Sequence, residues 1–287
     1  GVFMFADKKW GPMKVYNMFN NIGRNGQTVA TAADANIKTM ADLKGKRVTW
    51  VKGSPALNGN MAGFLACGGL TWDDVVKVEV SGYGASANAV INGQADASMG
   101  SSVSSIFNKT NASPRGLFFP PMPHNDEVSW KRAIATAPHF AKAVVTNFVG
   151  SSDSNKSFEG MNYPYPIFVT METTSEDLSY HLTEAVMDNY DQFKDSGPGM
   201  DGYQLSNQNF SWIFPYHPGA VKFYKKKGVW TSKHDKHNAN LIKRQDILAK
   251  AWQKTLKANL SGDAFKKKWL ENRASALKAA GMPNAYN

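Results

Sequence analysis

Residues 39–99 read TMADLKGKRVTWVKGSPALNGNMAGFLACGGLTWDDVVKVEVSGYGASANAVINGQADASM, and this stretch decides the fold. Short runs of apolar and β-branched residues alternate in it with longer helical patterns, and glycine-containing breaks separate them. The patterns predict strands and helices in alternation, with strands at 47–51, 77–80 and 95–99 and helices at 56–66 and 86–92. Because strands that alternate with helices form βαβ units, the stretch indicates a parallel sheet within an α/β fold.

The rest of the chain extends this unit into two lobes. We expect a second lobe from residues 38–163 and a first lobe that combines residues 1–37 with residues 164–287, where long amphipathic helices end the chain. The chain would then cross between the lobes twice, near residues 34–38 and 162–166. Two crossings form a hinge, which permits closure around a ligand held in a cleft between the lobes.

Composition limits the class of protein. The chain has 287 residues, of which 42% are hydrophobic and 20% charged, so it can bury a large core. Its net charge of +10 suits acidic ligands, nucleic acid or an anionic surface. The lysine runs at 225–227 and 266–268 fall in helical patterns and are typical of solvated faces. No nucleic-acid-binding motif accompanies the charge, so we expect no nucleic-acid partner.

Signals for catalysis or metal binding are weak. Cys67 is the only cysteine, which excludes a disulfide framework, and its surroundings are those of a buried filler. His217 precedes Pro-Gly and is expected to cap or pack at a helix start. The spacing of His124, Asp126 and Glu127 matches no metal-ligand motif. We therefore predict no catalytic residue, no metal and no cofactor.

The strand–loop–helix segment at residues 47–66 is the first candidate binding site. The first amide groups of a helix have no internal partners and carry the positive end of its dipole, so a carboxylate binds there favourably. The candidate ligand-binding residues in this segment are Ser54, Ala56, Leu57 and Asn58. An ordinary βα turn in which Ser54 only caps the helix explains the same residues, and both interpretations stay open at this point.

Two further loops follow predicted strands of the same lobe. They contain Tyr83, Ser101 and Ser102, among small residues that allow a ligand to approach the backbone. We predict that these three residues line the site, although plain turn chemistry accounts for the serines equally well. No single arginine stands out as a carboxylate clamp, and Arg115 and Arg132 stay open as candidates.

Four motifs resemble a known family. Residues 39–48 (TMADLKGKRV) are similar to the entry segment of the second lobe of type II periplasmic binding proteins, and residues 52–58 (KGSPALN) lie where such receptors carry a ligand loop. Residues 90–97 (VINGQADA) resemble a further signature of such receptors, and residues 216–230 (YHPGAVKFYKKKGVW) resemble a motif of the TAXI family, the solute receptors of one class of TRAP transporter. The resemblance covers nearly the whole chain.

This resemblance implies a type II periplasmic binding protein with two discontinuous α/β lobes joined by a hinge. It implies a monomeric periplasmic receptor without enzymatic activity, which captures a small organic anion or amino acid, such as a dicarboxylate or glutamate, and delivers it to TRAP membrane permease subunits. It also favours the helix start near Ser54 as the site, and it adds Ser157 and Phe158 as ligand contacts. Family members carry a further N-terminal βαβ region, so we expect part of the first lobe to be missing from this chain.

Three other functions remain as alternatives. An ABC-type receptor of the same fold is the nearest, and the His-Pro-Gly-Ala motif is the feature that argues against it. An enzyme on the same fold is the second, of which porphobilinogen deaminase, with its cofactor anchored on one cysteine, is the example. Cys67 lacks the basic pocket which that role needs. The third is a binder of nucleic acid or an anionic surface, suggested by the net charge alone.

Overall fold

The computed structural model describes residues 11–284, and they divide between two compact units. Among the described residues the first lobe consists of residues 11–21, 164–194 and 203–284, and the second lobe consists of residues 22–163 and 195–202. The lobes are discontinuous in sequence, and one crossing falls between Tyr163 and Pro164, within the predicted segment 162–166.

Two features differ from the prediction, which assigned residues 1–37 and 164–287 to the first lobe. Residues 195–202 belong to the second lobe, so the chain crosses to it and back once more than expected. In the structure residues 22–37 belong to the second lobe, because strand β2 (Gln27–Thr31) pairs with β5 (Ala97–Ser101) and with β7 (Phe158–Asn162) of that lobe. The chain therefore crosses near Asn21 rather than near residues 34–38. Backbone pairing over such a long sequence separation leaves no local signal, so periodicity alone could not detect it.

The second lobe is built on a six-stranded sheet in the order β4-β3-β5-β2-β7-β6. Strand β3 (Arg47–Val51) lies between β4 (Val76–Val80) and β5 and runs parallel to both. These are the three parallel strands that the sequence predicts, with bounds shifted by one or two residues. Beyond them β2 is antiparallel to β5, and β6 (Ala141–Val145) is antiparallel to β7. The sheet is therefore mixed rather than purely parallel.

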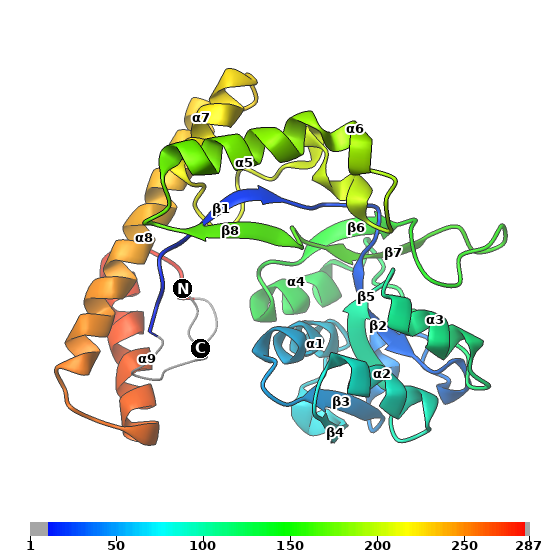
Figure 1. Ribbon diagram of the computed structural model, residues 1–287. Coiled ribbons are helices and arrows are strands. Elements are labelled where there is room, and N and C mark those ends of the chain that lie inside the picture. The colour runs from blue at the N-terminus through cyan, green and yellow to red at the C-terminus, as the bar shows by residue number, and fades with distance from the viewer. Residues whose placement is uncertain (1–10, 285–287) are drawn as a thin grey trace. The chain divides into compact units, whose positions relative to one another are not determined.

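Helices cover both faces of this sheet (Figure 1). One face carries α1 (Pro55–Cys67) and α4 (Glu127–Thr136), whose apolar side chains pack with Val29, Val48 and Met99 in one buried cluster. The other face carries α2 (Tyr83–Ile91) and α3 (Ser105–Ala112). Short 3₁₀ turns of this lobe lie at Ala33–Ala35, Met40–Leu43 and Trp72–Asp74, and a fourth at Met200–Tyr203 spans the boundary to the first lobe. Because side chains alternate along a strand, neighbouring residues of β2 and β5 face different helix layers.

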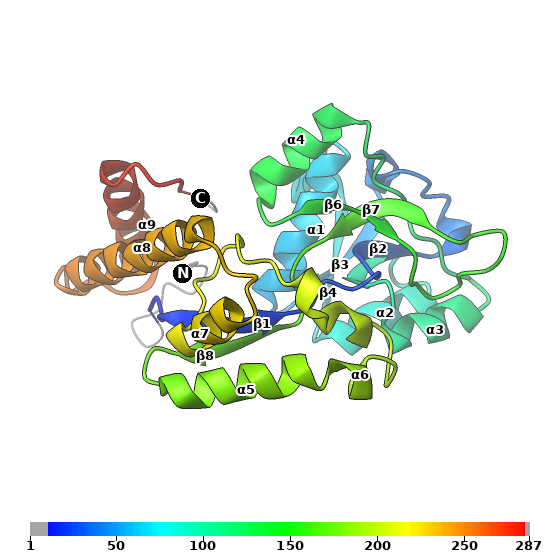
Figure 2. The ribbon, with the colours of Figure 1, turned by 90° about the horizontal axis from the view of Figure 1, so that it is seen from above.

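The first lobe pairs β1 (Val15–Asn20) with β8 (Ile167–Met171) in an antiparallel ribbon. Its helices are α5 (Glu176–Asp188), α6 (Tyr190–Phe193), α7 (Pro218–Lys226), α8 (Ser232–Leu256) and α9 (Gly262–Ala279), with a 3₁₀ turn at Leu205–Asn207. An aromatic cluster around Phe210, Tyr216 and Tyr224 forms its core. Figure 2 shows α8 lying alongside α9, where Trp252 and Trp269 pack edge to face.

The His-Pro-Gly-Ala motif has a structural explanation in this lobe. His217 is the N-cap of α7, where its Nδ1 accepts a hydrogen bond from the Gly219 N–H at 3.3 Å, which confirms the predicted capping role. Pro218 takes the first helical position, where its missing N–H costs nothing. Gly219 lies against the backbone of α5, and the buried Ala220 completes the contact between the two helices.

Candidate functional site

The carboxyl ends of β3, β4 and β5 lie at one edge of the sheet in the second lobe, because these strands are parallel. The chain leaves β3 toward α1 on one face and leaves the neighbouring β5 toward α3 on the opposite face (Figure 1). Such a divergence of adjacent loops is a topological switch point, which opens a crevice at the strand ends in α/β proteins. This edge is the candidate site.

The start of α1 supplies hydrogen-bond donors at this edge. Ser54 is the N-cap residue and Pro55 the first helical residue, and the Asn58 N–H bonds to the Ser54 carbonyl at 3.2 Å. Among residues 11–284 no acceptor faces the N–H groups of Ala56 and Leu57, and the Ser54 hydroxyl makes no capping bond. Ala56 is exposed and Leu57 half-buried. The two amides lie at the positive end of the helix dipole.

Asn58 has a different role from the one predicted. Its side chain is buried, its Oδ1 accepts from the Val51 N–H at 2.9 Å, and its Nδ2 donates to the Val51 carbonyl at 2.9 Å. The carboxamide thus pairs with the last residue of β3 as a neighbouring strand would. The Asn58 side chain thus holds the end of β3 to the first turn of α1. Its two hydrogen bonds direct it into the lobe rather than toward a ligand.

Three polar residues lie on the α1 face of the same edge. Ser101 and Gln27 are directly opposed in the β5–β2 pairing, and Asn25 donates from Nδ2 to the Ser101 Oγ at 3.3 Å. The pairing of Val48 with Ala97 places the loop after Val51 next to Ser101. Val29 and Met99, two residues further along each strand, belong to the core beneath α1, so Gln27 and Ser101 point to that face.

Two of these side chains have hydrogen-bonding groups left over. The Gln27 side chain makes no hydrogen bond within residues 11–284, although the residue is only 4% exposed and its Nε2 is fully buried. The Asn25 Oδ1 is likewise buried without a partner in that range. Most buried polar atoms in proteins are hydrogen-bonded, so unsatisfied groups of this kind call for an explanation. Sequence analysis missed both residues because it assigned residues 1–37 to the other lobe.

The fixed charges near this edge are already paired. Lys52 bonds to Glu79 at 2.8 Å and Arg24 to Asp201 at 3.0 Å. Arg115 binds Asp34 and Asp96 and also donates to backbone carbonyls. Arg132 donates to the carbonyls of Ala66 and Cys67. Neither arginine that the sequence left open as a clamp therefore points to the start of α1.

Tyr83 and Ser102 lie on the other face of the sheet. The Tyr83 hydroxyl lies against Gly100 of β5, where it fills the space that a Cβ would need, beside Phe107 of α3. Ser102 is fully buried, and its Oγ donates to the Asn147 carbonyl at 2.8 Å and accepts from the Gly26 N–H at 3.1 Å. The prediction that these residues join Ser54 and Ser101 is corrected, because Tyr83 packs on Gly100 and Phe107, and Ser102, which follows the last residue of β5, bonds to the backbone of Gly26 and Asn147 rather than to Asn25.

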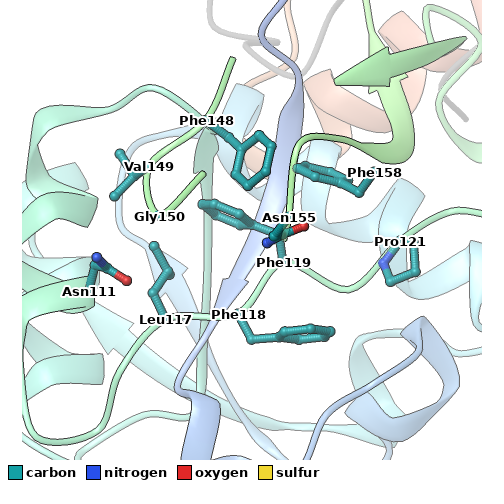
Figure 3. A pocket seen from close by; sticks show the side chains of 10 residues that line it. All are labelled: Asn111, Leu117, Phe118, Phe119, Pro121, Phe148, Val149, Gly150, Asn155 and Phe158. Atoms are coloured by element: carbon teal, nitrogen blue, oxygen red, sulfur yellow. The ribbon is translucent and has the colours of Figure 1, made fainter. Parts of the chain in front are cut away.

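Phe158 lines a separate pocket, and Ser157 is exposed just before β7. The pocket has a volume of about 220 Å³ and is lined mainly by aromatic and apolar side chains, with Asn111 and Asn155 among the lining residues (Figure 3). Phe158 stacks on Phe119 with 5.7 Å between the ring centroids and meets Phe148 edge to face. These rings belong to the cluster on the α2 and α3 face, so the structure does not bring Phe158 together with the start of α1.

The described part of the chain lacks a metal-binding cluster, a reactive thiol and a membrane-spanning helix. Within residues 11–284 no group of three or more His, Cys, Asp or Glu side chains is arranged to hold a metal ion. Burial raises the pKa of the Cys67 thiol to about 11, which keeps it protonated and unreactive at neutral pH. None of the helices in this range combines the length and the apolar character that crossing a membrane requires.

Comparison with known proteins identifies the family. A model of the NMT1-like family matches residues 11–228. The chain belongs to the NMT1-like family. The two lobes of this NMT1-like chain are discontinuous in sequence, and the second combines a mixed sheet with helices, which agrees with the type II periplasmic binding protein fold that the sequence resemblance implies. No curated protein matches this chain.

Several solved structures resemble this NMT1-like protein. The aliphatic sulphonate binding protein SsuA from Escherichia coli is 22% identical, with 37% of this chain and 33% of that chain covered and a TM-score of 0.31. An ABC transporter periplasmic binding protein from Brucella ovis with glutathione bound is 13% identical, with coverage of 63% and 48% and a TM-score of 0.35. The L-cystine solute receptor of Neisseria gonorrhoeae is 13% identical, with coverage of 64% and 61% and a TM-score of 0.29. The NMT1-like chain thus spans 33–61% of the length of these three proteins.

Proposed function

We propose that this protein is a solute-binding receptor without catalytic activity, which captures a small organic anion or amino acid in the periplasm. The observation that carries the proposal is the pair of unsatisfied amides at Ala56 and Leu57, at the topological switch point of the second lobe. A carboxylate or sulfonate accepts hydrogen bonds from both amides and gains from the helix dipole. The Ser54 hydroxyl adds a third donor.

The amides suit binding better than catalysis. The loops around the start of α1, at residues 23–27, 52–57 and 101–105, contain no histidine, cysteine or carboxylate that could act as a base or nucleophile. Their two charged residues, Arg24 and Lys52, are paired with carboxylates. The edge therefore provides donors and hydroxyl groups that hold an anion without a group to transform it.

Charge at position 56 tests the site. Ala56→Glu places a negative side chain at the start of α1, where it stabilises the helix by roughly 0.3–1 kcal/mol and repels a bound anion. Ala56→Gln has the same size without the charge. We expect small carboxylates and sulfonates to raise the melting temperature of the wild type and of Ala56→Gln, and to raise that of Ala56→Glu much less. Equal responses of the two variants would falsify the α1 site.

We further propose that the permease that receives the solute is of the TRAP type. The similarity of residues 216–230 to a TAXI signature supports delivery to TRAP permease subunits by a monomeric receptor. An ABC permease is the alternative for a receptor of this fold. Uptake assays with each permease type in proteoliposomes distinguish the two, because TRAP uptake depends on an ion gradient and ABC uptake on ATP. Uptake driven by ATP alone would overturn the TRAP assignment while leaving the receptor function intact.

A further inference from the structure

Two buried carboxamides flank Ser101 and have hydrogen-bonding capacity that the fold does not use. Gln27 is 4% exposed and Asn25 is 7% exposed. Within residues 11–284 the Gln27 side chain makes no hydrogen bond, and Asn25 uses its Nδ2 on Ser101 but leaves its Oδ1 unsatisfied. Together the two side chains offer at least one unused donor and one unused acceptor.

These carboxamides lie beside the proposed anion site. Gln27 opposes Ser101 across the β2–β5 pair, and Asn25 bonds to the same serine, so both sit at the carboxyl end of β5. The parallel pairing of β3 with β5 brings the loop before α1 to that end. A small molecule whose carboxylate binds the Ala56 and Leu57 amides would therefore lie beside the carboxamides of Asn25 and Gln27, on the same face of the sheet.

We propose that Asn25 and Gln27 contact the bound solute and select for an uncharged polar group on the molecule that carries the carboxylate. The inference rests on the proposed function, because the α1 amides fix one end of the solute. A primary carboxamide donates and accepts at once, so it complements both unused groups. A second charge at this place would be buried among uncharged side chains, since Asn25, Gln27 and Ser101 carry no charge. Dicarboxylates are therefore weaker candidates than their half-amides.

Matched pairs of acids test the selection. The half-amides malonamate, succinamate and glutaramate are compared with isovalerate, 4-methylpentanoate and 5-methylhexanoate, in which an isopropyl group replaces the carboxamide. We expect at least one half-amide to bind about tenfold or more tightly than its isopropyl partner, as measured by calorimetry on the full chain. The series covers three spacings between the carboxylate and the polar group.

Gln27→Met separates recognition from structure. Methionine matches the length of glutamine without its polar groups, so the unliganded variant should melt at the same temperature as the wild type or higher. Its affinity for the preferred half-amide should fall about tenfold to the level of the isopropyl partner, whose own affinity stays unchanged. Thr28→Val is the control, because this neighbouring buried residue faces the other side of the sheet and should preserve the preference.

The outcomes distinguish the two proposals. Equal binding of half-amides and isopropyl acids, both sensitive to Ala56→Glu, overturns the role of Asn25 and Gln27 and leaves the α1 site standing. A preference that survives Gln27→Met, or a large loss of melting temperature in that variant without ligand, also overturns it. Failure of all six acids to bind overturns both proposals.

Discussion

The side chain of Asn58 forms two hydrogen bonds with the backbone of Val51, each 2.9 Å long, one to the N–H and one to the carbonyl. Asn58 lies in the first turns of α1 and Val51 ends β3, so this pair fixes the angle at which the helix leaves the sheet. The unsatisfied amides of Ala56 and Leu57 lie between them in sequence. The position of the candidate site therefore depends on Asn58, although the Asn58 side chain bonds to Val51 and does not itself face the site.

Asn58→Asp should destabilise the second lobe. The carboxylate still accepts from the Val51 N–H, but its second oxygen replaces a donor and faces the Val51 carbonyl in a buried position. We expect a loss of about 3 kcal/mol in the free energy of unfolding at pH 7, measured by urea denaturation. Acidification should recover part of the loss, because a protonated carboxyl group can donate again.

Asn88→Asp is the control for this substitution, since Asn88 is exposed on α2 and changes in the same chemical way. It should alter the free energy of unfolding by less than about 0.5 kcal/mol. Equal effects of the two substitutions would show that the bonds to Val51 are not what stabilises the loop.

The local parts of the second lobe could be predicted from sequence. The strands at Arg47–Val51 and Val76–Val80 and the helix at Pro55–Cys67 follow from alternation, helical spacing and glycine stops, which are properties of adjacent residues. Thr39 and Asp42 form a capping box, which their spacing of three residues indicates locally, with the Asp42 carboxylate accepting from the Thr39 N–H at 2.8 Å. These features need no information from distant segments.

The rest depends on pairing between distant segments. Nothing in the residues of β2 shows that they pair with β5, a strand about seventy residues later in the sequence, and without that pairing Gln27 and Asn25 belong to no site. The sequence alone also does not show which face of the sheet a strand residue points to. Ser101 and Ser102 are adjacent in the sequence, and the register with β2 is what directs Ser101, the last residue of β5, toward α1.

Asp96 should give the second lobe a dependence on pH in acid. Burial raises the pKa of this carboxyl group, but hydrogen bonds from the side chain and backbone of Arg47, and from Arg115, outweigh burial and lower the pKa to about 2. The stabilisation is therefore complete above about pH 4 and is lost as pH falls toward 2. Asp96→Asn should lose about 2 kcal/mol of unfolding free energy at pH 7 and approach the wild type near pH 2.

Urea denaturation between pH 2 and pH 7 measures this difference. Asp153→Asn removes a carboxylate that is fully exposed, so its denaturation curves should follow those of the wild type throughout. A constant gap between Asp96→Asn and the wild type at all pH values would mean that the ion pairs with Arg47 and Arg115 do not account for the stabilisation.

His139 should act in a higher pH range. Its Nε2 lies 2.7 Å from the Asn60 Oδ1, the Asn60 Nδ2 donates to the Tyr163 hydroxyl at 2.7 Å, and burial lowers the pKa of the imidazole to about 4. A histidine in the unfolded chain titrates near pH 6.5, so the stabilisation is complete above that pH and declines as pH falls to 4. The expected loss of unfolding free energy over this range is up to about 3 kcal/mol.

His139→Gln should remove this decline, because glutamine can donate to Asn60 but takes up no proton. The measurement is the free energy of unfolding at pH 7.5 and pH 4.5 for the wild type, for His139→Gln and for His181→Gln, whose side chain is mostly exposed. The idea fails if His181→Gln flattens the profile as much as His139→Gln does.

Gly219 and Gly59 should respond in opposite directions to the same substitution. Both glycines lie in helices, where alanine is favoured by roughly 1 kcal/mol. A Cβ on Gly59 would meet nothing within 4 Å, so Gly59→Ala should raise the free energy of unfolding by about that amount. A Cβ on Gly219 would meet the backbone of α5, at 2.8 Å from the Tyr180 nitrogen and closer still to the Glu176 carbonyl oxygen.

Gly219→Ala should therefore destabilise the first lobe, because a backbone contact cannot be relieved by rotating a side chain. Helix α7 would have to move away from α5, which disturbs the buried Ala220 and Phe223, and overpacking of this kind costs about 1–3 kcal/mol or more. Thermal unfolding of both variants measures the contrast. If Gly219→Ala proved as stabilising as Gly59→Ala, the close approach of α5 and α7 would not be the reason for a glycine in the His-Pro-Gly-Ala motif.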